Sequence, residues 1–236
     1  MIKVAVAGAA GRMGQTVCAA VEGAPDMELV ARADPLLGRS LAEVLDRAAT
    51  GVAPQVVVDF TTPDTALENA LACMRAGVHV VIGTTGFDPA PLIARAQETG
   101  PGEAGLPRAN VLIAPNFAIG AVLMMRFAAL AAPHMAKAEI IELHHDGKLD
   151  VPSGTAKRTA ELMARAGDRE EPPIHSVRLP GLVANQEVIL GDLGQTLTIR
   201  HETINRESFM PGVLLAVRRV GTLERSPIVG LENLLF

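Results

Sequence analysis

The stretch that decides the fold is KVAVAGAAGRMG, residues 3–14. Lys3–Ala7 is a short apolar run that predicts a β-strand, and Gly11–Glu22 has the spacing of an amphipathic helix. Glycines at positions 8, 11 and 14 differ from the usual G-x-G-x-x-G spacing only in the middle glycine. Gly8 permits a tight turn, Gly14 lets the helix pack on the strand, and the start of a helix attracts an anion. We therefore expect this loop to bind the pyrophosphate of a dinucleotide, with small residues at 9–11 that let backbone amides approach it.

A carboxylate closes the second predicted strand. Asp34 follows the run Glu28–Ala33 and stands twenty residues after Gly14, where an acidic side chain accepts hydrogen bonds from ribose hydroxyls. A carboxylate there repels a 2′-phosphate and so favours NAD. Three nearby cations could offset that repulsion and leave NADP use open: Arg12, Arg32 and Arg39. The cofactor we expect is accordingly NADH, NADPH or both.

Strands and helices alternate over the first part of the chain. Three more short apolar runs predict strands, and two amphipathic stretches predict helices. The expected strands are Gln55–Phe60, Val78–Ile82 and Asn110–Ala114, the expected helices are Pro63–Ala76 and Pro89–Glu98, and a Gly/Pro-rich connector covers Thr99–Pro107. This alternation favours βαβ units, and hence an α/β fold with a Rossmann-like parallel sheet and helices on both faces.

The pattern changes after Pro115, where strands follow one another. The expected helices are Phe117–Ala132 and Thr155–Ala166, and the expected strands are Ala138–His144, Ser176–Leu179, Gln186–Leu190 and Thr196–His201, the last two joined by a hairpin turn at Gly191–Gly194. We expect a second α+β domain with a mixed sheet over residues 115–211. A final helix, Gly212–Val220, would return to the first domain, which would then comprise residues 1–114 and 212–236.

Three further strand ends are of interest, because ligands of open α/β sheets bind outside the carboxyl ends of the strands. Residues 61–63 follow the third strand, and we interpret them as turn and N-cap residues. Residues 83–86 follow the fourth strand, and their amides and hydroxyls could bind a carboxamide. Residues 114–117 follow the fifth, where the side chain of Asn116 can donate and accept at once.

The densest chemical segment is ELHHDGKLDVPSGTA, residues 142–156. It brings two imidazoles, His144 and His145, close in sequence to the ammonium of Lys148. Residues 153–155 then offer amides and hydroxyls at the start of a helix, which suits a carboxylate. Each residue alone would be explained as part of a solvated loop or a cap, but together they favour a catalytic site. Adjacent histidines match no common metal-ligand spacing, so we expect no metal.

Composition excludes several classes of protein. The 236 residues include 49% hydrophobic and 20% charged residues, which is ordinary for a chain that buries a core. There is no Tyr or Trp, and the net charge of −5 gives no general attraction to nucleic acid. No apolar run approaches the roughly 20 residues that cross a bilayer. Cys18 and Cys73 are expected to be buried and reduced. We therefore expect a cytoplasmic protein that binds neither nucleic acid nor membrane.

Five segments together resemble the family of 4-hydroxy-tetrahydrodipicolinate reductases, also called dihydrodipicolinate reductases. They are VAGAAGRMG (6–14), VVDFTTP (57–63), GTTGF (83–87), APNFAIG (114–120) and the segment 142–156. The resemblance runs nearly from end to end, and the last segment is the most specific. Two departures are small: Val151 stands where the family commonly has Ala, and Ala118 where Ser is frequent.

The resemblance implies a nicotinamide-dependent reductase of the diaminopimelate route to lysine, with a small dicarboxylate as substrate. It also implies domain closure and a homotetramer assembled through the sheet of the second domain. His144 would be the acid/base residue and Lys148 the proton donor. Cofactor contacts would come from Gly8, Ala9, Ala10, Gly11, Arg12, Met13, Asp34, Gly83, Thr84, Thr85, Ala114, Pro115, Asn116 and Phe117. Substrate contacts would come from His145, Ser153, Gly154 and Thr155.

The chemistry of the residues agrees with these assignments. Hydride addition to a cyclic imine dicarboxylate drives negative charge towards the ring nitrogen, which an ammonium such as Lys148 can stabilise and protonate. His144 can relay the proton, because an unperturbed imidazole titrates near neutral pH. Two alternatives stay open: another Rossmann dehydrogenase that acts on an amino dicarboxylate, and a cofactor-sensing module, which would leave the HHDGK segment unexplained.

Overall fold

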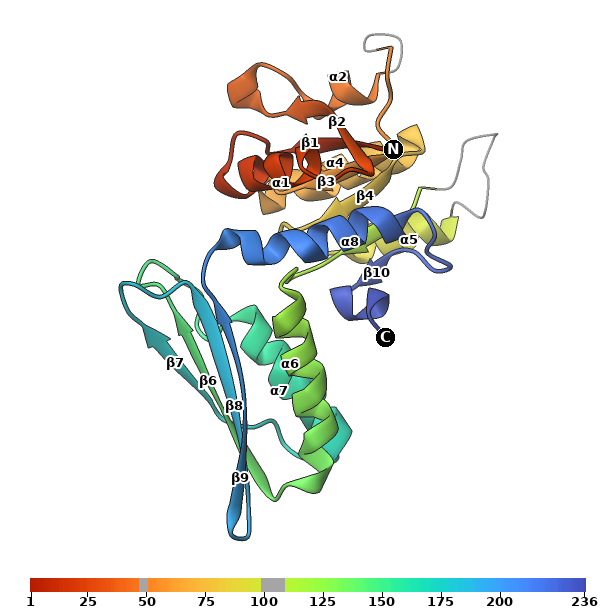
Figure 1. Cartoon of the computed structure of the whole chain (residues 1–236). Coiled ribbons are helices and arrows are strands. Elements are labelled where there is room, and N and C mark those ends of the chain that lie inside the picture. The colour runs from red at the N-terminus through yellow and green to blue at the C-terminus, as the bar shows by residue number, and fades with distance from the viewer. Residues whose placement is uncertain (47–50, 99–108) are drawn as a thin grey trace. The chain divides into compact units, whose positions relative to one another are not determined.

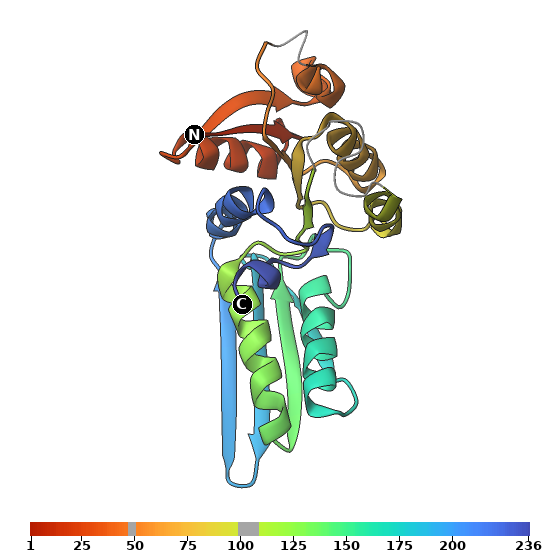
Figure 2. The same ribbon diagram turned by 90° about the vertical axis from the view of Figure 1, so that its right-hand side faces the viewer.

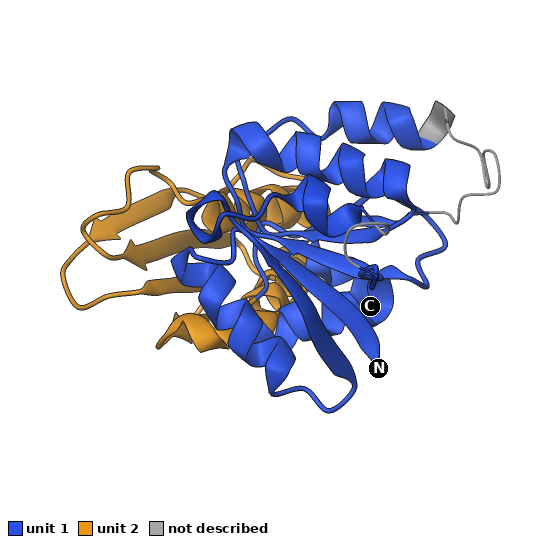
Figure 3. Ribbon diagram, turned by 90° about the horizontal axis from the view of Figure 1, so that it is seen from above, with its two compact units in different colours: residues 1–117, 209–236 blue, residues 118–208 orange. Residues whose placement is uncertain are grey.

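The computed structural model describes residues 1–46, 51–98 and 109–236, which form two compact units (Figure 3). Unit 1 comprises Met1–Phe117 and Phe209–Phe236, and unit 2 comprises Ala118–Ser208. The connector that we expect at Thr99–Pro107 lies outside the described residues. Each unit has its own sheet, and each is described by itself.

Unit 1 is built on a six-stranded parallel sheet (Figure 1). The strands are β1 (Ile2–Ala7), β2 (Met27–Ala33), β3 (Val56–Asp59), β4 (His79–Ile82), β5 (Val111–Ile113) and β10 (Ile228–Val229). Their order is β10-β5-β4-β3-β1-β2, so β2 and β3 lie on opposite sides of β1. The gap between β1 and β3 is therefore the switch point at which such sheets bind ligands. The predicted strands agree within one residue, and β10, two residues long, was not predicted.

Helices cover both faces of this sheet. They are α1 (Arg12–Glu22), α2 (Leu41–Leu45), α4 (Pro63–Ala76), α5 (Ala90–Glu98) and α8 (Met210–Val220), with short 3-10 turns at Pro35–Leu37 and Leu231–Leu234. α8 packs on α1 and on β3, β4 and β5, whereas α2, α4 and α5 enclose a core on the other face. Strands covered on both faces explain the apolar run at β3, where Val57 and Val58 have no exposed surface.

Two glycines after β1 are required by close backbone contacts. Gly8 has a φ of +77°, and a Cβ at this position would lie 2.6 Å from the carbonyl oxygen of Phe60. The loops that follow β1 and β3 therefore touch. A Cβ at Gly14 would lie 2.0 Å from the carbonyl oxygen of Gly8, so α1 begins directly against the turn. The structure thus agrees with the roles expected for Gly8 and Gly14, and it places the glycine loop at the switch point.

Unit 2 contains a four-stranded mixed sheet in the order β7-β6-β8-β9. Its strands are β6 (Lys137–His144), β7 (Ile174–Arg178), β8 (Ala184–Asp192) and β9 (Gln195–Thr203), and its helices are α6 (Ile119–Ala131) and α7 (Gly154–Gly167). A 3-10 turn, Ala132–His134, follows α6, and another, Arg206–Phe209, follows β9 and leads back to unit 1. Only β6 and β7 pair in parallel. The expected class, a parallel sheet plus a second domain with a mixed sheet, is confirmed.

Both helices of unit 2 lie on one face of its sheet (Figures 1 and 2). Ile140 of β6 and Val188 of β8 are fully buried against Ala160 and Met163 of α7. The β8–β9 hairpin is tighter than predicted, because β8 continues to Asp192 and only two residues, Leu193 and Gly194, form the turn. Gly194 has a φ of +72°, as a short hairpin turn commonly requires.

The starts of two helices show the caps that the sequence predicts. Thr62 precedes α4, whose first residue is Pro63, and the two hydroxyls of Thr62 and Thr65 lie 3.1 Å apart. At the start of α7 the hydroxyl of Ser153 accepts the N–H of Ala156 at 3.2 Å.

No helix among the described residues is long and apolar enough to cross a membrane. Cys18 and Cys73 are buried free thiols, as expected.

The contact at Gly14 makes a prediction for stability. Gly14→Ala should lower the free energy of unfolding by about 3 kcal/mol, at the upper end of overpacking, because the three atoms nearest to the new methyl group all belong to the backbone. Gly23→Ala, at the other end of α1 and with no contact closer than 3.4 Å, should change it by less than about 0.5 kcal/mol. Urea unfolding of both variants measures the difference, and equal midpoints would contradict the close packing at Gly14.

Candidate active site

Asp34 closes the glycine loop of unit 1. Its Oδ2 accepts the N–H of Ala10 at 3.0 Å, and its Oδ1 accepts the N–H of Leu36 at 2.9 Å. The residue is only 9% exposed. Each carboxylate oxygen keeps a second lone pair. Asp34 therefore shapes the loop through one set of lone pairs and keeps others for a ligand.

Most amides of the glycine loop are used within the protein. The N–H groups of residues 8 and 9 donate to the carbonyl of Ala33 at 2.9 and 3.3 Å, and that of residue 11 donates to the carbonyl of Gly8 at 3.0 Å. Together with the Ala10–Asp34 bond, these contacts engage the amides that we expect to face a pyrophosphate. Helix geometry instead leaves the N–H groups of residues 12–14 without an intrahelical acceptor. An anion bound at this loop would therefore take hydrogen bonds from the first turn of α1.

A buried carboxylate organises the ends of β3 and β4. Asp59 has no exposed surface and accepts the N–H and the hydroxyl of Thr61 at 2.9 and 2.7 Å. It also accepts from the amide of Asn69 at 2.8 Å and from the hydroxyl of Thr84 at 3.3 Å. Thr84 is therefore buried with its hydroxyl turned inwards, whereas Thr85 is exposed. Of the two threonines, Thr85 is the one whose side chain is accessible to a ligand.

An aromatic ring that sequence reasoning passed over joins three of these loops. The ring of Phe60, which follows β3, lies 5.8 Å from the ring of Phe117, which follows β5. It also covers Gly83 at the end of β4, where a Cβ would lie 2.2 Å from the Phe60 ring. Gly83 is thus required by the packing of Phe60. The loops after β3, β4 and β5 form one packed platform at the carboxyl edge of the sheet.

The second group of predicted residues lies in unit 2, at the carboxyl end of β6. His144 is the last residue of that strand, and the N–H of Lys148 donates to the carbonyl of His145 at 3.1 Å to close a turn. The ammonium of Lys148 donates to Asp150 at 2.6 Å. The chain then enters α7 at Ser153. The structure therefore brings His144, Lys148 and the start of α7 to one end of unit 2.

Glu142 connects these elements, although sequence reasoning assigned it no role. Its side chain has no exposed surface. Oε1 accepts from Nη2 of Arg178 at 2.7 Å and from the N–H of Ser153 at 3.3 Å. Oε2 accepts from Nη1 of Arg178 at 3.0 Å and contacts Nδ1 of His144. These four contacts, made by three residues, suit the lone pairs of an ionised carboxylate.

The protonation states follow from this network. Burial lowers the pKa of His144, and the charges of Lys148 and Arg178 act in the same direction, against the opposing effect of Glu142. Burial alone would raise the pKa of Glu142, but hydrogen bonds from Arg178, Ser176 and His144 outweigh it and lower that pKa. At neutral pH Glu142 is therefore ionised and His144 is neutral. Because a carboxylate only accepts, the imidazole proton resides on Nδ1 and Nε2 is a bare acceptor.

Arg178 is a further residue that sequence reasoning missed. Besides Glu142, it donates from Nη2 to the carbonyl of Asp150 at 2.8 Å and from Nε to the carbonyl of Lys148 at 3.4 Å. Arg178 thereby fastens the segment of Lys148 to the sheet. Arg178 reaches these groups because β7 pairs with β6, which sets Arg178 opposite His144. No local motif around position 178 signals that contact.

The start of α7 offers a place for an anion. A Cβ built at Gly154 meets nothing within 4 Å, so the backbone there borders open space. Ser153 is buried, and Thr155 is half-buried. The first N–H groups of a helix attract negative charge. This position can therefore bind a carboxylate.

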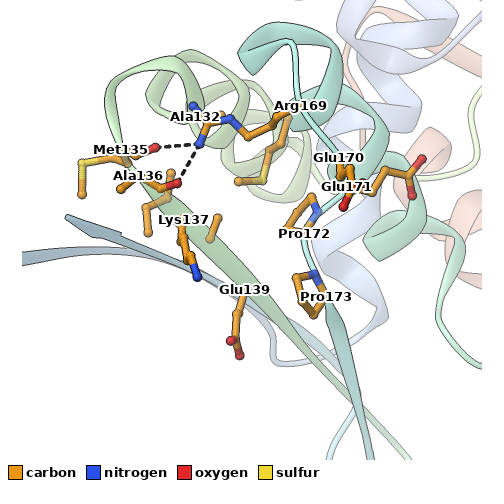
Figure 4. Close-up of a pocket in the computed structure, with 13 residues that line it drawn as sticks. Ala132, Met135, Ala136, Lys137, Glu139, Arg169, Glu170, Glu171, Pro172 and Pro173 are labelled. Carbon is orange, nitrogen blue, oxygen red and sulfur yellow. Dashed lines mark hydrogen bonds between the residues drawn. The ribbon is translucent and has the colours of Figure 1, made fainter.

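The hollow shown in Figure 4 lies elsewhere in unit 2. It has a volume of about 510 Å³ and is lined by residues near the amino end of β6, among them Lys137, Glu139 and Arg169. Arg169 is held there by the carbonyls of Met135 and Ala136. His144 lies at the other end of β6, and none of the predicted site residues lines this hollow. Within the described ranges, no group of three His, Cys, Asp or Glu side chains could hold a metal ion.

Two family models match the chain in succession. The model for the dihydrodipicolinate reductase N-terminus matches residues 2–117, and the model for the C-terminus matches residues 120–235. The chain belongs to the dihydrodipicolinate reductase family. This confirms the family that five short segments indicate, and the N-terminal match ends at the residue where the first part of unit 1 ends.

Individual relatives agree with this membership. The 4-hydroxy-tetrahydrodipicolinate reductase of Thermobifida fusca is 49% identical over 259 residues, covering 100% of this chain and 99% of the relative. The enzyme of the same name from Nocardia farcinica is 49% identical over 242 residues and covers 93% of each chain. The solved structure of the dipicolinate-bound dihydrodipicolinate reductase of Paenisporosarcina sp. TG-14 is 37% identical, covers 99% of each chain and superposes with a TM-score of 0.77.

Proposed function

We propose that the chain is a 4-hydroxy-tetrahydrodipicolinate reductase, which uses NADH or NADPH to form tetrahydrodipicolinate and water in diaminopimelate and lysine biosynthesis. The observation that carries this proposal is the carboxyl end of β6. There a buried carboxylate holds His144, a lysine follows four residues later, and a helix start borders open space at Gly154. Relatives of that name, and a family structure with a dicarboxylate bound, support the substrate class.

Unit 1 fits a dinucleotide. A turn that only glycine adopts easily precedes α1 at the switch point, the first amides of α1 are available, and Asp34 lies against the turn. We assign the pyrophosphate to the loop Gly8–Gly11 with the amides of Arg12 and Met13, and the adenosine ribose to Asp34. Gly83–Thr85 and Ala114–Phe117 would surround the nicotinamide. When bound, the reduced nicotinamide supplies the hydride.

The cations around Asp34 would allow NADH or NADPH to bind. The guanidinium of Arg32 is engaged by Glu22 at 2.7 Å. Arg39 lies beside Asp34, since the N–H of Asp34 donates to the Arg39 carbonyl at 2.8 Å, and Arg12 is exposed at the start of α1. Arg39 and Arg12 are therefore the cations placed to offset the repulsion between Asp34 and a 2′-phosphate.

The residues of unit 2 supply the proton. Negative charge that develops on the ring nitrogen of the substrate is stabilised by the ammonium of Lys148, which then donates a proton to that nitrogen. The amine left on Lys148 is reprotonated through His144, whose bare Nε2 takes up a proton from a hydronium ion of the solvent and leaves water. His145 and the residues Ser153, Gly154 and Thr155 bind the two carboxylates of the substrate. Asp150 holds the ammonium of Lys148 until substrate arrives.

We also propose a cytoplasmic homotetramer assembled through the sheet of unit 2. α6 and α7 cover one face of this sheet. Because side chains alternate along a strand, Ile141 and Leu143 of β6 and Ile189 of β8 point to the other face. All three are half-buried, and the polar pair of Glu139 with His175 accompanies them on that face. A second copy that covers this face would bury the apolar row.

The catalytic assignment is tested with 4-hydroxy-tetrahydrodipicolinate prepared in situ. The wild type should oxidise NADH, NADPH or both, and Lys148→Ala should lower kcat by about 10²–10⁴, the share of a general acid. The Kd for NADH should stay the same, and its fluorescence is easily followed because the chain has no Tyr or Trp. Unchanged turnover in the variant would refute the role of Lys148. Activity with aspartate but not with this substrate would refute the proposed function.

Gly154 tests the substrate site separately from the chemistry. Gly154→Ala should raise KM for the dicarboxylate at least about tenfold, because the new methyl group would fill space next to the amides that bind a carboxylate. Its midpoint of urea unfolding should not fall, since nothing lies within 4 Å of the added Cβ and Ala is the better helix former. The Kd for NADH serves as the control and should not change. An unchanged KM would exclude carboxylate binding at this helix start.

A further inference from the structure

We infer that Glu142 and Arg178 act as a positioning pair for this reaction, Glu142 by fixing the proton of His144 on Nδ1 and Arg178 by fastening the segment of Lys148. Glu142 begins the segment 142–156, but neither it nor Arg178 is among the residues predicted to contact cofactor or substrate. The catalytic part of this inference rests on the proposed function, whereas the placement of the imidazole proton can be measured without any substrate.

The first step is the orientation of the imidazole. Glu142 and His144 are two residues apart on β6, so their side chains lie on the same face of the sheet. Oε2 of Glu142 contacts Nδ1 of His144, and the carboxylate is fixed in turn by both terminal nitrogens of Arg178. An imidazole held at Nδ1 by an immobile acceptor presents Nε2 in one direction only. A positioned acid/base residue needs that constraint.

The second step concerns the segment that carries the ammonium. Arg178 donates to the backbone carbonyls of Lys148 and Asp150, and Asp150 accepts from the side chain of Lys148. The guanidinium thus connects the end of β7 to the backbone on either side of Leu149, and to Glu142. The same arginine sets the orientation of the imidazole through the carboxylate and the place of the lysine through its backbone.

The third step is the charge that the relay creates. The charged groups around the His144 ring are Glu142, Arg178, Lys148 and Asp150. When Nε2 takes a proton from a hydronium ion of the solvent, an N–H bond forms as an O–H bond breaks and water is left. The ring becomes a cation beside the guanidinium of Arg178, while Lys148 is still a neutral amine. Glu142 already accepts the Nδ1 proton, so it stabilises that cation without rearrangement. The proton then passes to the amine of Lys148, and the neutral imidazole with its proton on Nδ1 is restored.

Glu142→Gln tests the first step. The glutamine amide has nearly the same shape, but an NH2 group replaces one of the two oxygens. At the Oε1 position the NH2 would face two fixed donors, Nη2 of Arg178 and the N–H of Ser153, so we expect it at the Oε2 position, where the imidazole of His144 can change its tautomer. The proton of His144 should leave Nδ1 for Nε2, which ¹⁵N chemical shifts of labelled histidine report, with His144→Asn for assignment. We expect kcat to fall by about 10²-fold, as for a misplaced catalytic group, with KM changed less than about threefold. Loss of the carboxylate charge should also move the acid limb of the kcat–pH profile to lower pH.

Arg178→Lys tests the second step and keeps a positive charge. It removes the paired contact with Glu142 and the two carbonyl contacts, so we expect a lower kcat and faster amide hydrogen exchange over residues 148–150. Arg169→Lys is the matched control, because Arg169 also holds two backbone carbonyls, those of Met135 and Ala136 at 2.8 and 3.1 Å, at the other end of β6. This control should leave both kcat and exchange at 148–150 unchanged.

The outcomes separate the inference from the proposed function. A kcat in both variants equal to that of the wild type would overturn the positioning pair. A proton on Nε2 of His144 in the wild-type protein at pH 7 would overturn it too. If Glu142→Gln does not fold, Arg178→Lys remains as the test. An unchanged kcat together with unchanged amide exchange at residues 148–150 in Arg178→Lys would overturn the inference as well. If the wild type does not reduce 4-hydroxy-tetrahydrodipicolinate, the proposed function fails, while the histidine shifts and the exchange at 148–150 still test the structural role of the pair.

Discussion

The carboxyl end of β6, where the candidate catalytic residues of unit 2 lie, depends on one constraint, the burial of the charged Glu142 side chain. A carboxylate removed from water must be paired and hydrogen-bonded, because the penalty for leaving it alone is several kcal/mol. Glu142 contacts the guanidinium of Arg178 on β7, the imidazole of His144 at the end of its own strand and the N–H of Ser153 just before α7. Three segments distant in sequence are thereby held together. The residues proposed to move the proton are those that satisfy or adjoin this carboxylate.

Carboxylates with little or no exposed surface also organise two strand ends in unit 1. Asp34, after β2, accepts two backbone N–H groups and closes the glycine loop. Asp59, the last residue of β3, gathers Thr61, Asn69 and Thr84. In each case a shielded acid at the carboxyl end of a strand shapes the loop where a ligand of an open α/β sheet would bind. Binding and catalytic groups can then lie on loops without being loosely held.

Sequence reasoning succeeded where a local pattern carries the information. Apolar periodicity located the predicted helices and strands within two residues, and the spacing of Gly8 and Gly14 predicted the turn and the packing. It failed where the cause is a contact between distant segments. The role of Arg178 depends on β7 pairing with β6, and the role of Phe60 depends on three loops meeting. α2 was also missed, although Ser40 and Glu43 form a capping box that could have indicated it.

Whether an ionised Glu142 organises the carboxyl end of β6 can be measured from the titration of its side-chain carboxyl, followed by ¹³C NMR. In the folded protein the pKa is lowered from the usual 4.5 by the donors around it, so the carboxyl should still be mostly ionised at pH 4.5. The stability that these contacts provide is then present above pH 4.5 and is lost as the pH falls through the lower folded value. A titration midpoint at or above 4.5 would show that burial outweighs Arg178, Ser176 and His144, and that these contacts do not hold Glu142 as an ion.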